Sequence, residues 1–430
     1  MSILGFRRYA LLSCATAAML AGCGGSQSPG AMPRSALATR AERGTSWMLR
    51  GGLQPPTGAP SATSRNAASS PSYRVLHRFN RNDESGGARP LSGLINVDGT
   101  LYGTTFGRGN GTVFSISTTG KHRTLHRFNG RDGSSPWDAP LVAMNGTLFG
   151  TTYYDSVVFS VGINGGSKVI HHFTGKADGL EPWAGLTDVS GTLYGTTSEG
   201  GGGICSEGCG TVFSISASGA ENVVYRFSGE PDGETPGAAL LDVNGTLYGT
   251  TANGGEYGNG CVYSITASGA ENVLYSFGRK PDGNYPIAPL IDVKGTLYGT
   301  TLFGGTSEDG TVFSVSTTGK EKVLYSFTGG SDGEGPDAAL LNVHGTLYGM
   351  TGFGGSSSCS ASGYYGCGTV YSVTTSGVEK VLYAFEGGTD GAQPQANLVD
   401  VKGTLFGTTI YGGGRECAGI GCGTVFEIKP

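Results

Sequence analysis

Short apolar segments alternate with polar turn residues along most of the chain. The run AALLDV (238–243), for example, is followed by Asn244-Gly245 and then by TLYGTT (246–251). Segments of this length that are rich in aromatic and β-branched residues predict β-strands. An Asn-Gly or Asp-Gly pair between two of them supplies the positive φ angles of a two-residue hairpin turn. Since no segment shows a helical pattern over three turns, the sequence predicts an all-β protein.

The same four segments recur seven times. The phrase Gly-Thr-Leu-(Tyr/Phe)-Gly begins at Gly99, Gly146, Gly191, Gly245, Gly295, Gly345 and Gly403. A phrase close to Gly-Thr-Val-Phe follows it at Gly111, at the variant SVVF (156–159), and at Gly210, Gly260, Gly310, Gly368 and Gly423. A phrase close to Val-Leu-Tyr-x-Phe ends at Phe79, Phe128, Phe173, Phe227, Phe277, Phe327 and Phe385. With the apolar run before each first phrase, the seven copies predict twenty-eight strands.

Four-stranded units of about fifty residues favour a seven-bladed β-propeller, in which the blades pack around an axis. An open solenoid is the alternative. The order of the segments favours the ring, because the folded part begins with the third phrase (73–79) and ends after the second (423–428). We count strands A to D from the axis outward. Residues 73–79 are then expected to form strand D of blade 7, which joins the two ends of the fold and leaves no open edge.

The first 72 residues differ in composition from the rest. Two arginines precede a short apolar run and the tetrapeptide LAGC that ends at Cys23, the pattern of a secretion signal over residues 1–22. LAGC resembles the bacterial lipobox, which implies lipid attachment to Cys23; an ordinary cleaved signal is the alternative. Residues 23–72 are rich in Ser, Ala, Gly and Pro, which predicts a flexible tether before a propeller at 73–430.

Charge divides at the same boundary. Residues 73–430 hold 21 of the 28 Lys and Arg residues and 32 of the 33 Asp and Glu residues, a net charge of −11. So acidic a body argues against nucleic acid as a partner. We expect no cofactor and no metal site, since the histidines of the third phrase stand where other copies have Tyr or Ser: His77, His126, His171 and His172.

The phrases LYSFTGGSDGEGP, GTLYGTT and GTVFSIS resemble the tandem GloVer (Gloeo/Verruco-type) repeat family of bacterial exported proteins, and more distantly the blades of kelch propellers. The resemblance covers essentially residues 73–430. It implies a secreted or membrane-anchored repeat protein. The family has no catalytic motif that could be transferred to residues of this chain.

In a propeller the D–A and B–C connections lie on one face of the ring. These connections hold nearly all the length variation of the seven repeats, and variable loops on a rigid scaffold are where binding sites are usually built. Three cysteine pairs bracket B–C loops: Cys205 and Cys209, Cys359 and Cys367, and Cys417 and Cys422. In an exported protein such local pairs predict disulfides, with metal binding as the alternative. Cys261 stands alone and is expected to be a packed, buried thiol.

Six D–A connections contain the motif Asp-Gly-x-x-Pro. Its aspartates could form a ring of carboxylates round one mouth of the channel, ready for cations or polar ligands. The structural alternative is that each Asp caps its own turn while Gly takes positive φ and Pro starts an edge. The aspartates are Asp132, Asp178, Asp232, Asp282, Asp332 and Asp390.

The residue after this proline varies more than a scaffold position should, and two copies have tryptophan there, Trp137 and Trp183. Other aromatic residues follow strand B toward the same face. Aromatic surfaces rimmed by acids and hydroxyls suit the stacking of sugar rings or the gripping of a peptide; packing beneath the loops is the alternative. The candidate aromatic residues besides the tryptophans are Phe106, Tyr154, Phe303, Phe353 and Tyr411.

Three functions are compatible with this pattern. The first is a monomeric binding module for a glycan or protein, lipid-anchored at the bacterial cell envelope and facing the periplasm or the exterior. The second is a hydrolase or lyase acting on polysaccharide at the same face. The third is a structural or adhesive envelope protein. No catalytic constellation is recognisable in the sequence, so we favour the binding module over the enzyme.

Overall fold

The computed structural model describes residues 71–80, 87–107, 109–137, 139–175, 177–356, 359–361, 364–415, 417 and 419–430. Contacts divide the chain into residues 1–70 and 71–430, and every described residue belongs to the second unit. The expected signal sequence, Cys23 and nearly all of the expected tether lie outside the described residues. In the described part there is no helix, and so none that could span a membrane.

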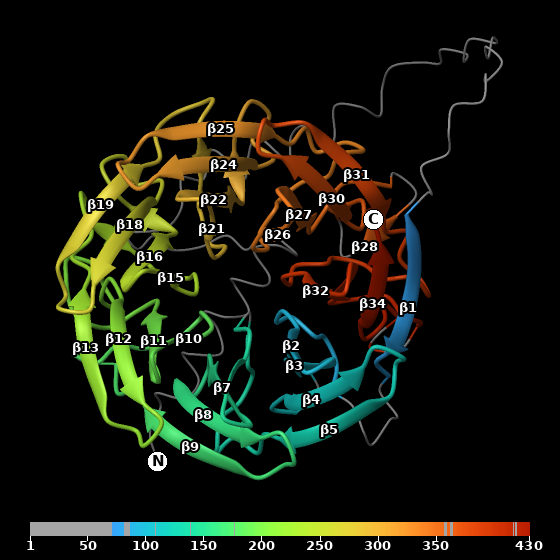
Figure 1. Cartoon of the computed structure of the whole chain (residues 1–430), viewed down its shortest axis with the longest axis horizontal. Helices are drawn as coiled ribbons and strands as arrows, with labels where there is room; N and C mark the ends of the chain where they lie inside the picture. Colours follow the sequence, from blue (N-terminus) through green and yellow to red (C-terminus); the bar gives the residue numbers. More distant parts are fainter. Residues whose placement is uncertain are drawn as a thin grey trace, which may run out of the picture. The chain divides into compact units, whose positions relative to one another are not determined.

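Seven four-stranded antiparallel sheets stand around an axis (Figure 1). The short A strands lie nearest the axis: β2 (Ile95–Val97), β6 (Val142–Met144), β10 (Thr187–Val189), β15 (Leu241–Val243), β21 (Ile291–Val293), β26 (Leu341–Val343) and β32 (Val399–Val401). The B strands come next: β3 (Thr100–Thr105), β7 (Thr147–Thr152), β11 (Thr192–Thr197), β16 (Thr246–Thr251), β22 (Thr296–Thr301), β27 (Thr346–Thr351) and β33 (Thr404–Thr409).

The outer half of each blade consists of its C and D strands. The C strands are β4 (Thr112–Ser117), β8 (Val157–Gly162), β12 (Thr211–Ser216), β18 (Cys261–Thr266), β24 (Thr311–Ser316), β30 (Thr369–Thr374) and β34 (Thr424–Lys429). The D strands, which follow the rim of the ring, are β5 (His122–Arg127), β9 (Ser167–His172), β13 (Glu221–Arg226), β19 (Glu271–Ser276), β25 (Glu321–Ser326), β31 (Glu379–Ala384) and β1 (Ser72–Arg78). The seven-bladed propeller predicted from the sequence is confirmed.

Blade 7 joins the two ends of the fold, as predicted. Strand β1 pairs antiparallel with β34, with Tyr73 opposite Ile428 and Arg78 opposite Thr424. The ring of Tyr73 also stacks on Tyr383 of blade 6, with centroids 3.9 Å apart. Strand β1 therefore completes one blade and packs against its neighbour.

The glycine inside each B strand makes room for an aromatic ring of the adjacent C strand. A Cβ atom on Gly299 would lie 2.7 Å from Cζ of Phe313 and 2.8 Å from Cδ2 of Leu290, closer than packed carbon atoms approach. Phe313 is fully buried between the blades. The phrase Gly-Thr-Leu-Tyr-Gly therefore recurs because each blade repeats this contact.

Short pairings join each D–A connection to the B–C connection of the blade that follows. Strand β14 (Gly233–Glu234) pairs with β17 (Asn253–Gly254), and β20 (Gly283–Asn284) pairs with β23 (Phe303–Gly304). Single antiparallel bridges do the same at other junctions, for example between Leu180 and Glu199. The two connection classes therefore lie together on one loop-rich face. In blade 6 the long B–C connection also contains a hairpin of its own, β28 (Ser360–Ala361) with β29 (Tyr364–Tyr365).

Candidate functional site

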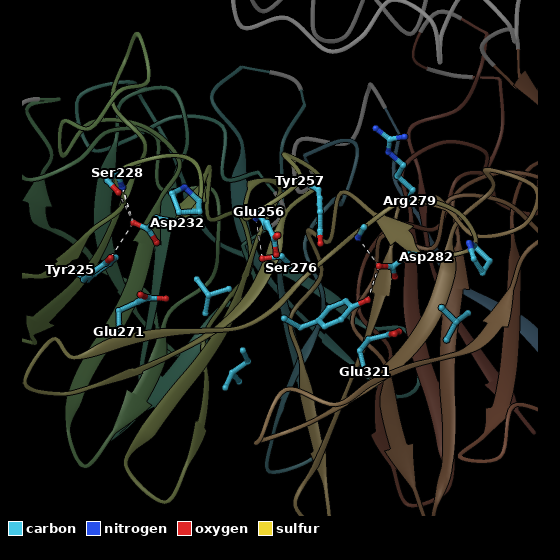
Figure 2. A pocket seen from close by; sticks show the side chains of 17 residues that line it. Tyr225, Ser228, Asp232, Glu256, Tyr257, Glu271, Ser276, Arg279, Asp282 and Glu321 are labelled. Carbon is cyan, nitrogen blue, oxygen red and sulfur yellow. Dashed lines mark hydrogen bonds between the residues drawn. The ribbon is translucent and has the colours of Figure 1, made fainter.

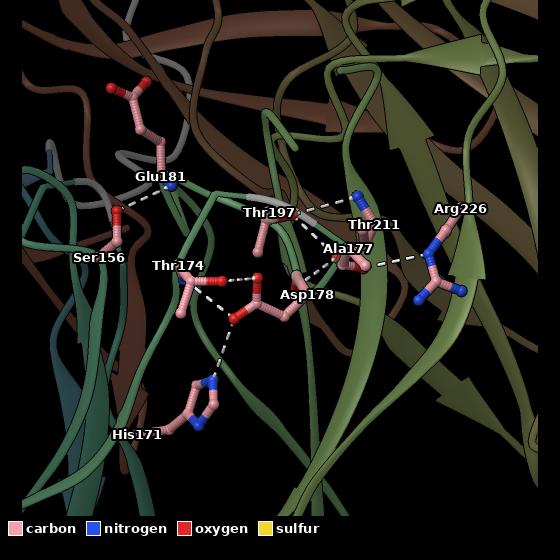
Figure 3. Close-up of polar contacts among 9 residues, drawn as sticks. All are labelled: Ser156, His171, Thr174, Ala177, Asp178, Glu181, Thr197, Thr211 and Arg226. Atoms are coloured by element: carbon pink, nitrogen blue, oxygen red, sulfur yellow. Dashed lines mark hydrogen bonds and ion pairs between the residues drawn. The ribbon is translucent and has the colours of Figure 1, made fainter. Parts of the chain in front are cut away.

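The Asp-Gly turns of the D–A connections are held by their own aspartates. Figure 3 shows the turn of blade 2, where Asp178 accepts hydrogen bonds from the backbone nitrogen of Thr174 at 2.9 Å and from its hydroxyl at 2.7 Å. The Nε2 atom of His171 lies 3.8 Å from Asp178 Oδ2. Burial acts to raise the pKa of Asp178, but the hydrogen bonds from Thr174 outweigh it and leave this pKa below its ordinary value.

The remaining aspartates of the motif repeat this arrangement with a tyrosine or histidine of the preceding D strand. Asp282 Oδ2 accepts from the hydroxyl of Tyr275 at 2.7 Å and from the backbone nitrogen of Gly278 at 2.6 Å. Asp132 lies 3.0 Å from Nε2 of His126. The equivalent tyrosine contacts are Tyr225 with Asp232, Tyr325 with Asp332 and Tyr383 with Asp390. Because their partners lie on D strands, these carboxylates sit toward the rim, away from the axis.

Five aromatic side chains form one cluster on the loop-rich face of blades 1 to 3, which we call the aromatic cluster. The ring of Phe106 meets Trp137 edge to face at a centroid distance of 4.6 Å. Tyr153 lies 5.8 Å from Trp137 and 6.4 Å from Trp183. Tyr154 adjoins Tyr153 at 5.4 Å and is 40% exposed. The structure therefore brings Trp137 and Trp183 together through Tyr153, a residue that the sequence did not single out.

Two glutamates act on this cluster. Burial raises the pKa of Tyr153, and the charge of Glu181, with a hydrogen bond between the two side chains, raises it further. Glu199 adds a smaller effect of the same sign. The backbone nitrogen of Glu181 donates to Ser156 Oγ at 3.0 Å, which fixes this segment against blade 2 (Figure 3). The cluster is thus an aromatic surface with carboxylates beside it, on the face where the loops vary.

The other predicted aromatic residues lie in separate places on the same face. Phe303 pairs with Tyr285 of its own blade at a centroid distance of 6.0 Å. Phe353 is buried, and the guanidinium of Arg89 lies 5.3 Å from the ring centre of Tyr411. We therefore assign these residues to loop packing and keep the aromatic cluster as the candidate site.

The residues that follow the prolines occupy equivalent places in the seven repeats, and we call them the inner ring; two pairs of them from neighbouring blades are in contact. Trp183 lies beside Gly237, and the carboxyl group of Asp337 hydrogen-bonds Gln395. Asp337 is only 8% exposed, and burial holds its pKa well above the ordinary value. The members of the inner ring are Leu91, Trp137, Trp183, Gly237, Ile287, Asp337 and Gln395.

Disulfides close three of the B–C connections, as the sequence predicted. They join Cys205 to Cys209, Cys359 to Cys367, and Cys417 to Cys422. Cys261 is a buried free thiol, and burial raises its pKa to about 12, so it stays protonated and inert. The described residues contain no group of three or more His, Cys, Asp or Glu side chains arranged to hold a metal ion.

A groove on the outer wall of the ring was not predicted from the sequence (Figure 2). It has a volume of about 1550 Å³ and spans the D strands of blades 3 to 5. At each junction a tyrosine and an aspartate of one blade meet a glutamate at the start of the next D strand. Burial, and then the charge of Asp232, raises the pKa of Glu271 to about 7. Burial and the charge of Asp282 raise the pKa of Glu321 to about 7 in the same way. The glutamate and tyrosine that line the groove are visible in the sequence as the repeated pattern Glu-x-Val-x-Tyr. The sequence does not show that the glutamate of one repeat contacts the tyrosine and aspartate of the repeat before it.

Several solved structures share the fold. A catalytically inactive virginiamycin B lyase from Staphylococcus aureus, crystallised with quinupristin, aligns with a TM-score of 0.55 at 14% identity, over 84% of this chain and 100% of that one. Oligogalacturonate lyase from Vibrio parahaemolyticus gives 0.51 at 8% identity, over 84% and 97% of the two chains. Quinohemoprotein alcohol dehydrogenase from Comamonas testosteroni gives 0.50 at 12% identity, over 83% and 76%. At these identities the likeness extends to the fold alone.

No curated protein matches the chain in sequence. A family model does match it: the Gloeobacter/Verrucomicrobia repeat covers residues 153–362, which run from blade 2 into blade 6. These residues contain the phrases on which the resemblance was based. The resemblance is therefore confirmed: residues 153–362 match the Gloeobacter/Verrucomicrobia repeat.

Proposed function

We propose that this propeller is an exported binding module that takes up a glycan on the aromatic cluster of its loop-rich face. The observation that carries the proposal is the convergence of Trp137, Tyr153 and Trp183, from three different connections, at one place on that face. Sugar rings stack on such aromatic surfaces through their C–H faces. Neighbouring carboxylates accept hydrogen bonds from sugar hydroxyls, and Glu181 is placed for this role beside Tyr153.

The position of the protein in the cell follows from the same proposal. Three disulfides support folding in an oxidising compartment outside the cytoplasm. Lipidation at Cys23 would anchor the chain to an envelope membrane, and a flexible tether over residues 23–72 would link the propeller to that anchor. A protein ligand on the same face is the alternative partner.

An enzyme acting on polysaccharide is the second candidate. Glycoside hydrolysis needs two carboxyl groups placed on either side of the scissile bond. Carboxyl pairs whose pKa values are raised lie at the outer wall, where Asp232 faces Glu271 and Asp282 faces Glu321. This arrangement repeats from blade to blade, which favours a structural role at the junctions over catalysis at one of them.

A glycan array probed with the full chain tests the proposal. We expect binding to one class of glycan, and a loss of about tenfold or more in affinity for the double variant Trp137→Ala and Trp183→Ala. Val378→Ala, which changes an exposed residue of a C–D turn, serves as the control and should bind as the parent does. The proposal is contradicted if no glycan is retained or if the double variant binds as tightly as the parent.

A further inference from the structure

Strand β19 (Glu271–Ser276) forms the floor of the outer-wall groove. It is the last strand of its sheet, so one edge of its backbone faces outward without a partner strand among the described residues. Val273 and Leu274 of this strand line the groove together with Pro231 and Pro281. Tyr257, which is 54% exposed, stands at its side. An open strand edge beside apolar side chains is the feature to which an added strand binds.

The seven D strands differ in how their edges are protected. Natural proteins commonly place lysine or another charged residue on an exposed edge strand to prevent pairing with another chain. Six of the D strands carry at least one Lys, Arg or His residue. Strand β19 has the sequence ENVLYS and carries none, whereas β25 has the sequence EKVLYS, with Lys322 at the position of Asn272. Among the seven D strands, β19 is therefore the one without a basic side chain.

Acidic side chains surround this edge. Glu271 lies at the start of β19 beside Asp232, and Tyr275 near its end hydrogen-bonds Asp282, which faces Glu321 (Figure 2). Glu256 also lines the groove, and Arg279 is the single basic residue among its lining residues. A partner strand laid along β19 would thus meet carboxyl groups at both of its ends.

We propose that the edge of β19 is a docking site for an extended, basic peptide segment of a partner protein. Backbone hydrogen bonds to the open edge would supply affinity for any extended chain. Two lysine or arginine side chains of the segment would reach the two acidic pairs. Glu271 faces blade 3 and Tyr275 faces blade 5, because a bulge in β19 turns them to opposite faces of the sheet, three positions apart along the paired strand or about 10 Å at the rise of a β-strand. The two basic side chains must therefore stand on opposite faces of the segment, three residues apart. This site is separate from the aromatic cluster and does not depend on the proposed glycan binding.

Fluorescence anisotropy with a labelled probe peptide tests the proposal on the full chain. The probe is an eight-residue peptide of alternating valine and threonine in which two lysines stand three residues apart, so that they point to opposite faces of the strand. We expect saturable binding with a Kd below about 1 mM, weakened about tenfold or more when alternate backbone nitrogens are methylated, because methylation removes the hydrogen bonds to the strand edge. The same peptide with glutamate in place of lysine should not bind.

Asn272→Lys is the decisive variant, because it gives β19 the sequence that β25 already carries without loss of fold. We expect it to weaken binding of the lysine peptide about tenfold or more. Lys168→Asn makes the reverse exchange at the equivalent position of β9, outside the groove, and should leave the affinity unchanged. The proposal is overturned if the lysine peptide does not bind, if the methylated peptide binds equally well, or if Asn272→Lys has no effect.

Discussion

The side-chain nitrogen of Asn259 donates a hydrogen bond to the backbone oxygen of Gly278 at 2.7 Å, and this contact joins the B–C loop of blade 4 to the turn that follows its D strand. The residue before the glycine of the second phrase holds the same place in other blades. In blade 3 it is Cys209, whose sulfur lies beside Gly229 of the corresponding turn. A disulfide and an asparagine therefore occupy equivalent positions in different copies of the repeat.

Removing the disulfide of blade 3 should destabilise the propeller by about 2 kcal/mol, since a crosslink across so short a loop removes little entropy from the unfolded chain. We expect this loss for the variant Cys205→Ser with Cys209→Ser. Cys205→Ser with Cys209→Asn should recover part of it, because asparagine can make the contact that Asn259 makes in blade 4. Denaturant unfolding under oxidising conditions measures the free energy of unfolding of both double variants. Equal stability of the two variants would contradict the equivalence of these positions.

The glutamates at the blade junctions should make stability depend on pH. Burial and a neighbouring aspartate raise the pKa of Glu271, Glu321 and Glu379 to about 7 in the folded protein, against 4.5 in the unfolded chain. A raised pKa means that the folded state holds the proton more tightly. The stabilisation is therefore complete below pH 4.5 and is lost as the pH rises to about 7.

The triple variant Glu271→Gln, Glu321→Gln and Glu379→Gln should remove this part of the pH dependence. We expect its Tm to exceed that of the parent at pH 8 and to match it near pH 4.5, because glutamine resembles the protonated acid. Glu207→Gln, at an exposed position, should leave the whole profile unchanged. If the Tm of the parent and that of the triple variant change equally between pH 4.5 and pH 8, the three glutamates do not have the raised pKa values on which this prediction rests.

Closure of the ring depends on side chains of β1 that reach two blades. Tyr73 stacks on Tyr383 and packs edge to face on Phe385, so Tyr73→Ala should lower the free energy of unfolding by about 2 kcal/mol. Arg74→Ala removes only an exposed ion pair with Glu427 on the same strand pair and should have no measurable effect. Denaturant unfolding measures the free energy of unfolding of the two variants. Similar values for Tyr73→Ala and Arg74→Ala would contradict closure through β1.

The fold could be predicted from the sequence because its information is local and repeated. Each Gly-Thr-Leu-Tyr-Gly phrase predicts one B strand. The folded part begins with a third phrase and ends after a second phrase, which predicts the pairing of β1 with β34. The disulfides were predictable for the same reason, since the two cysteines of each pair lie on one loop. Contacts between repeats were not. Glu271 meets Asp232, and Tyr153 meets Trp183, only after adjacent blades have packed.

The most direct test of glycan recognition by the aromatic cluster is the tryptophan fluorescence of the protein. Trp137 and Trp183 are two of three tryptophans in the chain, and a Trp47→Phe variant leaves only this pair. Titration of that variant with the glycan found on the array should change its emission with the same midpoint as binding measured by calorimetry. Binding by calorimetry without any change in emission would place the ligand elsewhere and contradict the account.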